Sequence, residues 1–524
     1  MASILTFNPA RFEQLVSQFG LRQAWINILA TRVSHSGHEF SYVLSDKIFK
    51  DAKILDDDLL DGLSIGEIGV LYEYCVAYVD KNSRKDNGQF FTPDDVSQFM
   101  VNQSLSFPMG VWLDPCSGIG NLSWHLINTQ RNKEEFLVSQ MKLSDKDELA
   151  LIIARVIFTL SFQSEHSNLY NEIKDSFIVF DFLSVSENEN SSLFGESQLG
   201  QIPKHDFVLV NPPYLGLKKE DDRFETSKAK DLYAYFLENI IKTSLGFIAV
   251  TPQSFTNAGK FRSLRALILR NFQSIKIYAF DNIPGNIFLG VKFGSTNSNT
   301  ANSMRAAITV AHKLEQSHKI TSLLRWRSSE RQSLLLQVNE FLSDTPLTEE
   351  FFPKVSSVFS PLYEHIELLP RLGSLLTSKK TQHVLFVPAA PRYFISALKK
   401  SVSRASMKTL YFRTEEDMNV AYLLLNSSFM YWWWRVRDGG MTLSLETISS
   451  LPLTQFKPEK ALIGLLEKSE TENIVYKKNA GAMHENVKHD MALVAKLNEL
   501  VIPTFSDLLI LTHDNSELTQ LDRT

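Results

Sequence analysis

Residues 205–216 read HDFVLVNPPYLG, and this stretch decides the predicted fold. Its first half, Asp206–Val210, is a short apolar run with the residue types of a buried strand. Pro212 and Pro213 then end the strand, because proline fixes φ and has no backbone N–H to pair. The stretch therefore predicts a buried strand that runs directly into a rigid turn.

A polar and an aromatic side chain flank the two prolines of this turn. Asn211 contributes a side-chain acceptor and Tyr214 a flat ring, while the proline carbonyls remain able to accept hydrogen bonds. These groups suit a planar amine that is held by acceptors and covered by a ring. A strand that merely ends in a Pro-Pro turn is the alternative, and it leaves the full Asn-Pro-Pro-Tyr string unexplained.

The bulk composition narrows the class of protein. A chain of 524 residues exceeds the usual size of a single core, so two or three domains are expected. Neither an apolar run of about 18 residues nor a signal peptide is evident, and we expect a cytoplasmic protein with no membrane partner. Two cysteines provide neither a disulfide framework nor a metal site. A net charge of −5 argues against a uniformly basic nucleic-acid binder but allows a local basic face.

The pattern along the chain predicts three parts. Residues 1–85 are expected to form a helical N-terminal segment, with Ser64 and Glu67 as a capping box. Residues 86–315 contain a βα succession between Val111 and His312, which predicts a mostly parallel sheet with helices on both faces. Residues 316–524 lose that rhythm and are expected to form a mixed C-terminal region.

The string GQFFTP at residues 88–93 precedes the first strand of this succession. Thr92 is a predicted helix N-cap, Pro93 is expected at the first helical position, and Asp95 completes a capping box. A well-capped helix explains Thr92 and Pro93 but not the whole string. The remaining residues, including Phe91, predict a loop with a functional role.

Acidic and glycine residues follow the predicted strands at their carboxyl ends, where ligands of open α/β sheets bind. The first strand leads into DPCSGIG, in which Asp114 can meet a cationic or hydroxyl group. Gly118 and Gly120 in the same string allow close approach of the backbone to a ligand. A tight strand-to-helix turn is the alternative explanation of the glycines.

The next two strands end in further candidate ligand groups. Asp145 and Asp147 follow the second, where a nucleoside site carries its ribose-binding acid, although Asp147 also fits a helix cap. Asp181 and Phe182 follow the third and suit an adenine amine and its ring face. Acidic residues thus occupy the positions at which a dinucleotide site binds phosphate, and the sequence contains no phosphate-binding loop. A nucleoside cofactor without phosphates, S-adenosylmethionine, fits these residues.

A basic block lies in the C-terminal region. Residues 371–413 contain nine Lys or Arg and no Asp or Glu, with aromatic residues interleaved. In an acidic chain this block predicts a surface for a phosphate backbone, and a merely solvated face is the alternative. The residues predicted to bind DNA are Lys379, Lys380, Arg392, Lys399, Lys400, Arg404, Lys408 and Arg413. The aromatic run Tyr431–Trp434 is predicted to be core rather than a base-stacking platform.

The motifs GQFFTP, DPCSGIG, SDKDELA, FDFL and NPPY occur in this order. With them, residues 84–312 resemble a class I S-adenosylmethionine-dependent DNA adenine methyltransferase of the gamma arrangement, of a restriction–modification type system. The resemblance implies a Rossmann-like methyltransferase domain between the helical N-terminal segment and a mixed target-recognition domain. The glycine motif departs from the family at Cys116 and Ser117, where small residues and another glycine are common.

The resemblance also implies roles for individual residues. Asn211 and the Pro212 carbonyl, in the catalytic string Asn211 to Tyr214 that includes Pro213, would accept the hydrogens of the target amine. Tyr214 and Phe288 would stack on the extruded base. The residues implied to bind the cofactor are Phe91, Thr92, Pro93, Asp114, Gly118, Gly120, Asp145, Asp181, Phe182 and Asn211.

The expected function is methylation of the N6 amine of a flipped-out adenine in double-stranded DNA, by the modification enzyme of a restriction–modification or phage-defence system. The expected partners are duplex DNA and a cognate restriction endonuclease or specificity subunit. A modification subunit that requires a separate specificity subunit is one alternative. Protein glutamine N5-methylation also uses an Asn-Pro-Pro-Tyr corner, but the basic block argues against it. Cytosine-carbon chemistry is disfavoured because Cys116 lies in the cofactor turn.

Overall fold

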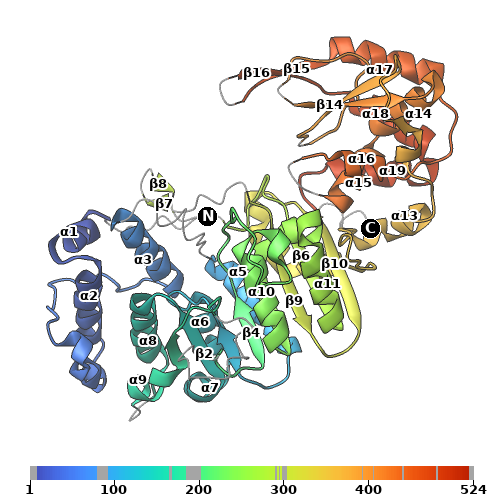
Figure 1. Cartoon of the computed structure of the whole chain (residues 1–524). Coiled ribbons are helices and arrows are strands. Elements are labelled where there is room, and N and C mark those ends of the chain that lie inside the picture. Colours follow the sequence, from blue (N-terminus) through green and yellow to red (C-terminus); the bar gives the residue numbers. More distant parts are fainter. Residues whose placement is uncertain are drawn as a thin grey trace.

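The computed structural model describes residues 9–79, 92–164, 168–184, 202–288, 292–293, 296–297, 304–391, 393–404, 406–438, 442–479 and 482–518. Figure 1 shows a large sheet with helices on both faces, N-terminal helices at one side, and a smaller C-terminal unit above it. The buried apolar residues form two clusters, one from Phe12 to Phe352 and one from Val355 to Leu509. The N-terminal helices therefore share a core with the sheet.

The large sheet has nine strands in the order β11-β10-β6-β9-β5-β4-β1-β2-β3. Their bounds are β1 Trp112–Asp114, β2 Met141–Asp145, β3 Phe177–Val179, β4 Phe207–Val210, β5 Gly246–Pro252, β6 Ser274–Phe280, β9 Ala306–His312, β10 Ser317–Leu324 and β11 Leu342–Asp344. The strands from β3 to β5 pair in parallel, whereas β9 runs antiparallel to both β5 and β6. This arrangement confirms the predicted α/β class I methyltransferase fold.

The strand of the opening motif lies inside this sheet. All four residues of β4 are buried, and the strand pairs in parallel with β1 on one side and β5 on the other. Full burial on both faces explains why its sequence is a continuous apolar run instead of an alternating one. The turn that follows β4 is consequently held at the carboxyl edge of the sheet.

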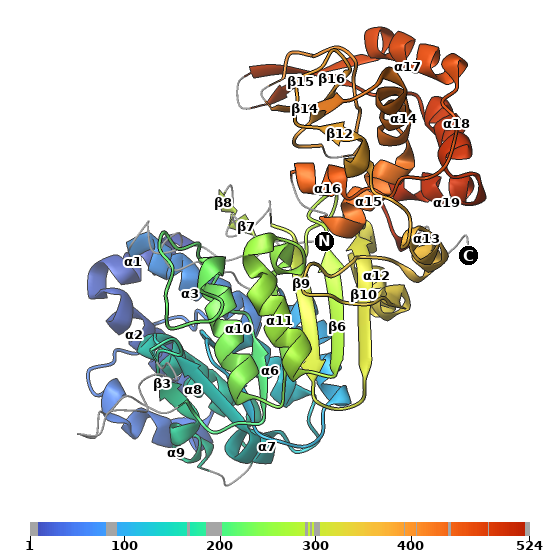
Figure 2. The same ribbon diagram turned by 45° about the vertical axis from the view of Figure 1, so that its right-hand side comes forward.

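The helices around the sheet follow the predicted alternation. The N-terminal helices and those of the sheet are α1 Pro9–Phe19, α2 Leu21–His35, α3 Ile65–Val79, α5 Asp94–Asn102, α6 Asn121–Asn128, α7 Lys133–Gln140, α8 Glu148–Phe162, α9 Leu169–Glu172, α10 Leu232–Thr243, α11 Arg262–Asn271 and α12 Arg331–Gln337. Helix α10 packs beside α11, and both lie in front of the sheet in Figure 2. Helix α5 packs beside α6. No helix in the ranges given above is long and apolar enough to cross a membrane.

Two predicted helix starts had opposite outcomes. The capping box before α3 is confirmed, since Ser64 N donates to Glu67 Oε2 at 2.9 Å and Glu67 N donates to Ser64 Oγ at 3.2 Å. The predicted cap at Thr92 is wrong, because α5 begins at Asp94 with Pro93 at its N-cap and no side-chain capping bond. Thr92 instead accepts a hydrogen bond from Asn211 Nδ2 at 2.9 Å. Asp95 likewise completes no box and pairs with Arg331.

The C-terminal unit combines helices with a small sheet. Its helices are α13 Ser360–Ile366, α14 Glu415–Leu425, α15 Ser428–Arg437, α16 Leu445–Ser449, α17 Lys460–Glu472, α18 Met491–Val501 and α19 Ser506–Ile510. Its strands are β12 Leu376–Thr377, β13 Val384–Pro388, β14 Met407–Phe412 and the hairpin β15 Ile474–Asn479 with β16 Ala482–Val487. A separate short pair, β7 Lys292–Phe293 and β8 Thr296–Asn297, follows the large sheet's β6.

The aromatic run of this unit is buried. Residues 431–434 on α15 are each at most 4% exposed, which confirms the prediction that Tyr431–Trp434 is core. The predicted domain limits at residues 85 and 315 stay a prediction. Beyond residue 315, β10 and β11 still belong to the large sheet, with β10 parallel to β6.

Candidate active site

The corner after β4 is built around the side chain of Asn211. Its Nδ2 donates to Thr92 Oγ1 at 2.9 Å, and its Oδ1 accepts from the Tyr214 hydroxyl at 2.6 Å. Its backbone carbonyl accepts from the Cys116 thiol at 3.3 Å. Thr92 and Tyr214 therefore fix the side-chain amide of Asn211 in one orientation, and Cys116 holds its backbone.

Tyr214 and Phe288 lie behind this corner. Tyr214 is 9% exposed and Phe288 is fully buried, and their rings meet edge to face at 6.3 Å between centroids. The Tyr214 hydroxyl also lies 2.8 Å from the Val250 carbonyl oxygen on β5. Burial raises the pKa of Tyr214 well above its ordinary value, so the phenol stays protonated and donates. Tyr214 thus orients Asn211 through its hydroxyl group.

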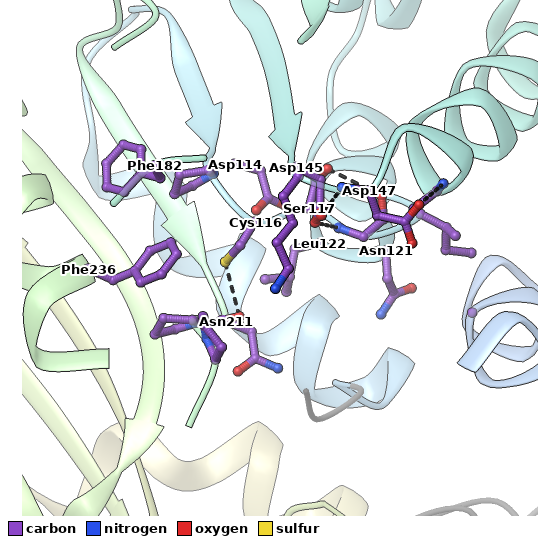
Figure 3. Close-up of a pocket in the computed structure, with 18 of the residues that line it drawn as sticks. Asp114, Cys116, Ser117, Asn121, Leu122, Asp145, Asp147, Phe182, Asn211 and Phe236 are labelled. Atoms are coloured by element: carbon purple, nitrogen blue, oxygen red, sulfur yellow. Dashed lines mark hydrogen bonds between the residues drawn. The ribbon is translucent and has the colours of Figure 1, made fainter. Parts of the chain in front are cut away.

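A cavity of about 380 Å³ opens at the carboxyl ends of β1, β2 and β4. It brings together most of the predicted cofactor residues with two residues of the predicted catalytic string: Thr92, Asp114, Gly118, Asp145, Asp181, Phe182 and Asn211, and then Pro212 and Pro213. Figure 3 shows Phe182 and Phe236 on one side of this cavity and Asp145 and Asp147 on the other, with Asn211 beneath Cys116. Pro93, Gly120, Tyr214 and Phe288 lie outside its lining, and Phe91 falls outside the residues that the structure describes.

Asp114, at the end of β1, is the most perturbed acid of the cavity. Its Oδ2 accepts from Ser123 Oγ at 3.1 Å, whereas its Oδ1 is buried without a hydrogen-bond partner. Burial raises the pKa of Asp114 to about 7, and hydrogen bonds to the carboxyl from Ser123 and from the backbone of Cys116 oppose this rise. A buried carboxylate oxygen without a partner is costly unless a ligand supplies a donor. The site is therefore suited to a cationic or N–H-bearing group beside Asp114.

Asp145, at the end of β2, connects the glycine turn after β1 to β2 through hydrogen bonds. Its Oδ2 accepts from Gly118 N at 2.7 Å and its Oδ1 from Asp147 N at 2.9 Å. Burial raises the pKa of Asp145 from its ordinary value, and both backbone bonds oppose that rise. Asp147 caps α8 through Leu149 N and accepts from the Tyr72 hydroxyl. Asp147 therefore acts as the helix cap that the sequence allowed.

The two glycines of the turn serve different purposes. Gly118 has φ +52° and lines the cavity, which leaves the backbone open to a ligand. Gly120 has φ +84° and caps α6, and a Cβ there would lie 2.7 Å from Cζ of Phe158. Gly118 is thus placed for ligand contact, while Gly120 is required by the close packing of the turn against α8.

An aromatic pair closes the far side of the cavity. The rings of Phe182 and Phe236 stack with centroids 5.5 Å apart and an interplanar angle of 22°. Asp181 beside them is exposed, and its Oδ1 accepts from Leu183 N at 3.0 Å. This wall offers an apolar face next to a carboxylate, as a purine with an exocyclic amine would require.

Sequence reasoning missed two contributions to this cavity. Phe236 is on α10, and nothing near it in the sequence marks a ligand site. Helix α3 lines the cavity with Gly69, Tyr72, Glu73 and Val76, although the N-terminal segment was assigned no role. Its apolar helix with small residues could have indicated close packing: a Cβ on Gly66 would lie 2.3 Å from Asp94 Oδ1.

The predicted DNA-binding residues are distributed over both ends of the small sheet. Strand β14 pairs Phe412 with Leu376 at one end and Met407 with Pro388 at the other. Lys379, Lys380 and Arg413 consequently lie at one end of the small sheet, and Arg404 lies at the opposite end. Lys408 lies within β14, Lys400 is exposed, and Lys399 pairs with Glu467 at 2.7 Å. Arg392 falls outside the residues that the structure describes.

Comparison with known proteins identifies a family for part of the chain. Residues 140–288 match the family model described as Eco57I restriction-modification methylase. This segment runs from β2 through the corner at Asn211 to Phe288, so it contains the predicted catalytic string. The match confirms, for this segment, the predicted resemblance to restriction–modification methyltransferases. No curated protein matches the chain.

Several solved structures are similar at low identity. The match to a DrdV–DNA complex covers 74% of this chain and 45% of the DrdV chain, with 13% identity and a TM-score of 0.46. The type IIG restriction endonuclease BpuSI matches 98% of this chain and 79% of its own, with 12% identity and a TM-score of 0.41. The match to a type I restriction-modification methyltransferase subunit from Streptococcus thermophilus covers 60% of this chain and 64% of that subunit, with 16% identity and a TM-score of 0.32. This chain spans under half of the DrdV chain, and values this low assign neither activity nor partner.

Proposed function

We propose that this protein is an S-adenosylmethionine-dependent methyltransferase that modifies the N6 amine of adenine in duplex DNA, as the modification enzyme of a restriction–modification system. The observation that carries the proposal is the placement of Asn211 and Pro212 in the lining of a cavity whose other walls suit a nucleoside cofactor. The family match over residues 140–288 supports it.

The residues of the cavity fit S-adenosylmethionine, which supplies an electrophilic sulfonium methyl group when it is bound. The partnerless Oδ1 of Asp114 can accept from an ammonium group, and Gly118 allows the backbone to approach. We assign the ribose hydroxyls to Asp145, the last residue of β2. Phe182 provides an apolar face for a purine, with Asp181 beside it. We also assign Thr92 and Pro93, at the start of α5, to this cofactor site.

The chain's own contribution to chemistry is to hold the target amine through acceptors. The Oδ1 of Asn211 has two lone pairs, and the hydrogen bond from Tyr214 takes one of them. Asn211 Oδ1 and the Pro212 carbonyl would accept the two amine hydrogens and stabilise the positive charge that develops on nitrogen during transfer. Positioning dominates such a displacement, and no strong base is needed because the methylated amine loses its proton afterwards.

The target adenine must leave the duplex to reach this corner. Extrusion of a base costs roughly a few kcal/mol, and stacking on an aromatic ring returns about 1–3 kcal/mol. Tyr214 and Phe288 are the proposed stacking rings. Because both are buried and in contact, a base can stack on Tyr214 only after the ring of Phe288 separates from it. The segment that carries Phe288 is therefore part of the proposed base site.

The first test is Asn211→Ala in the full chain. Transfer of labelled methyl groups to duplex DNA should fall below detection, because the amine loses a side-chain acceptor. Binding of S-adenosylmethionine, measured by calorimetry, should be retained because the acids and aromatic rings remain. Asn128→Ala, an exposed asparagine at the end of α6, should keep full activity. Full activity of Asn211→Ala would contradict the proposed mechanism.

The base that is modified can be identified separately. Long-read sequencing of DNA from a host that expresses the protein should show N6-methyladenine at one sequence motif. Methylation of a cytosine amine at such a motif would agree with the proposed mechanism but would show that the target base is cytosine instead of adenine. A genome without any methylated motif would shift the proposal to a protein glutamine substrate or to a form that needs a separate specificity subunit.

A further inference from the structure

A second and larger cavity lies where the C-terminal unit faces the large sheet. Its volume is about 1390 Å³. On the sheet side it is lined by residues that follow β6 and β10, including Asn282 and Arg325. On the other side it is lined by Tyr393, Arg404 and residues of the hairpin β15–β16. The cavity therefore belongs to neither unit alone.

The hairpin side of this cavity is basic. Arg404, Lys477, Lys478 and Lys488 line it, and Glu485 is the acidic residue among its hairpin lining. Within the described part of the chain, no ion pair joins these four cations to a carboxylate, and Arg404 bonds Asn486 and the Ala390 carbonyl. The whole chain has a net charge of −5. A concentration of unpaired positive charge here favours a polyanion as the occupant.

The hairpin itself projects beyond the helices of its unit. Its strands pair in antiparallel register from Ile474 with Val487 to Asn479 with Ala482. It is anchored where Glu485 N donates to the Ser403 carbonyl at 2.9 Å and Arg404 bonds Asn486. Tyr476, which pairs with Glu485 at the anchor, is 61% exposed, and Met483, nearer the hairpin tip, is 59% exposed. Figures 1 and 2 show the ribbon extending away from α17 on the side of the unit where β7 and β8 lie below.

The dimensions of the sheet relate this cavity to the catalytic corner. Strands β4 and β6 are three positions apart in the sheet, which is roughly 14 Å at the usual spacing between strands. Both are parallel strands of the same orientation, so their carboxyl ends open at the same edge. A duplex in the second cavity would therefore lie beside the corner at Asn211, within reach of one extruded nucleotide.

We propose that the hairpin β15–β16 enters a groove of duplex DNA, with Arg404, Lys477, Lys478 and Lys488 on the phosphate backbone. The inference rests on the proposed function and names the surface that holds its substrate. A major groove of about 12 Å admits a two-stranded β-ribbon. Lys379, Lys380 and Arg413, at the opposite end of the small sheet, lie away from this surface. Of the basic block at residues 371–413, Arg404 belongs to the proposed DNA surface, whereas the whole block does not.

The test compares two double variants of the full chain. For Lys477→Ala with Lys478→Ala, binding of a duplex, measured by fluorescence anisotropy, should weaken tenfold or more at low salt. The slope of log affinity against log salt should become shallower by about 1.8, because each lost phosphate contact removes about 0.9. Lys379→Ala with Lys380→Ala removes the same charge at the other end of the sheet and should leave both quantities unchanged. Lys477→Arg with Lys478→Arg should keep the wild-type slope.

Failures of this inference and of the proposed function can be told apart. If the wild-type chain methylates duplex DNA but the Lys477 and Lys478 variant keeps its salt slope, the hairpin surface is wrong and the function stands. The same conclusion follows if the Lys379 and Lys380 variant loses affinity instead. If the wild-type chain neither binds nor methylates duplex DNA, the proposed function fails, and the hairpin inference fails with it.

Discussion

The burial of Asp114 creates a carboxyl group that titrates near neutral pH. The side chain is 2% exposed, and one of its oxygens has no partner. Its pKa is about 7 because desolvation penalises the charged form. A cationic ligand next to this oxygen would favour the carboxylate and release a proton when it binds. Cofactor binding and the protonation of Asp114 are therefore linked.

This linkage predicts a pH dependence of cofactor affinity. The dissociation constant of S-adenosylmethionine should rise by about tenfold between about pH 8 and about pH 6, because the ionised fraction of Asp114 falls by that factor. Calorimetry in buffers of different ionisation enthalpy should show proton release at the lower pH. Asp114→Asn should remove the dependence, and the comparison subtracts the titration of the ligand's own amine. The same slope in Asp114→Asn would place the titrating group elsewhere.

At the scale of elements, one arginine joins α5 to the proposed base site. Arg331 on α12 pairs with the carboxylate of Asp95 on α5. Its guanidinium also donates to the carbonyls of Asn286 and Ile287, at 2.8 Å each. Phe288 follows directly and packs on Tyr214. Arg331 therefore acts as a positioning residue for the segment whose ring must separate from Tyr214.

Substitution of Arg331 should affect turnover more than cofactor affinity. Arg331→Lys keeps the charge but cannot bridge a carboxylate and two carbonyls at once, because an ammonium is a compact point charge. Loss of hydrogen bonds to a charged group, worth about 1.5–3 kcal/mol each, should lower kcat by about tenfold or more. The fluorescence of 2-aminopurine at the target position should report altered base extrusion. Arg327→Ala, an exposed neighbour paired with Glu330, is the matched control. An unchanged kcat in Arg331→Lys would contradict this role.

Local signals in the sequence predicted local structure well. The capping box of Ser64 and Glu67 formed as expected, since both partners lie within one helical turn. The cap at Thr92 failed because its side chain bonds Asn211, which is remote in the sequence. Phe236 was missed for the same reason, since its ring meets Phe182 only in the folded chain. The basic block gave no sign that β14 carries Arg404 and Arg413 to opposite ends of the small sheet, because strand pairing is a property of the folded chain.

The motif order predicted the arrangement of the site for a related physical reason. Asp114 and Asp145 end parallel strands and Asn211 follows one, and the carboxyl ends of parallel strands share one edge of a sheet. Recognising strands was therefore sufficient to bring these residues together. Tyr214 and Phe288 lie beside each other, but their burial depends on packing that no local pattern contains, and their stacking on a base stays a prediction.

At the scale of the whole molecule, one carboxylate joins the two units. Asp281 follows β6 and accepts from Arg305 at 2.8 Å and from Arg325 at 3.1 Å. It also accepts from Arg435 at 3.1 Å, and Arg435 lies on α15 in the second core. Glu517 approaches Arg435 at 3.6 Å. Asp281 and Arg325 line the second cavity, so this junction sets how the hairpin unit is held relative to the catalytic corner.

Asp281→Asn should destabilise the protein far more than an exposed pair does. The change removes the carboxylate that Arg305, Arg325 and Arg435 share, with Glu517 left near Arg435, and should lower the free energy of unfolding by about 3–5 kcal/mol, measured by urea denaturation at neutral pH. The arginines hold the pKa of Asp281 at about 2, below its unfolded value, so its contribution is present above about pH 4 and is lost as the pH falls towards 2. The difference in unfolding free energy between wild type and variant should therefore shrink only below about pH 4.

The control variant, Asp344→Asn, makes the same change at a residue whose side chain is 77% exposed, in an ion pair with Lys319, and should cost under about 1 kcal/mol. Equal losses in the two variants would show that the junction does not depend on Asp281, and the orientation of the hairpin unit would then have to come from contacts such as Lys354 N to the Val436 carbonyl at 3.1 Å.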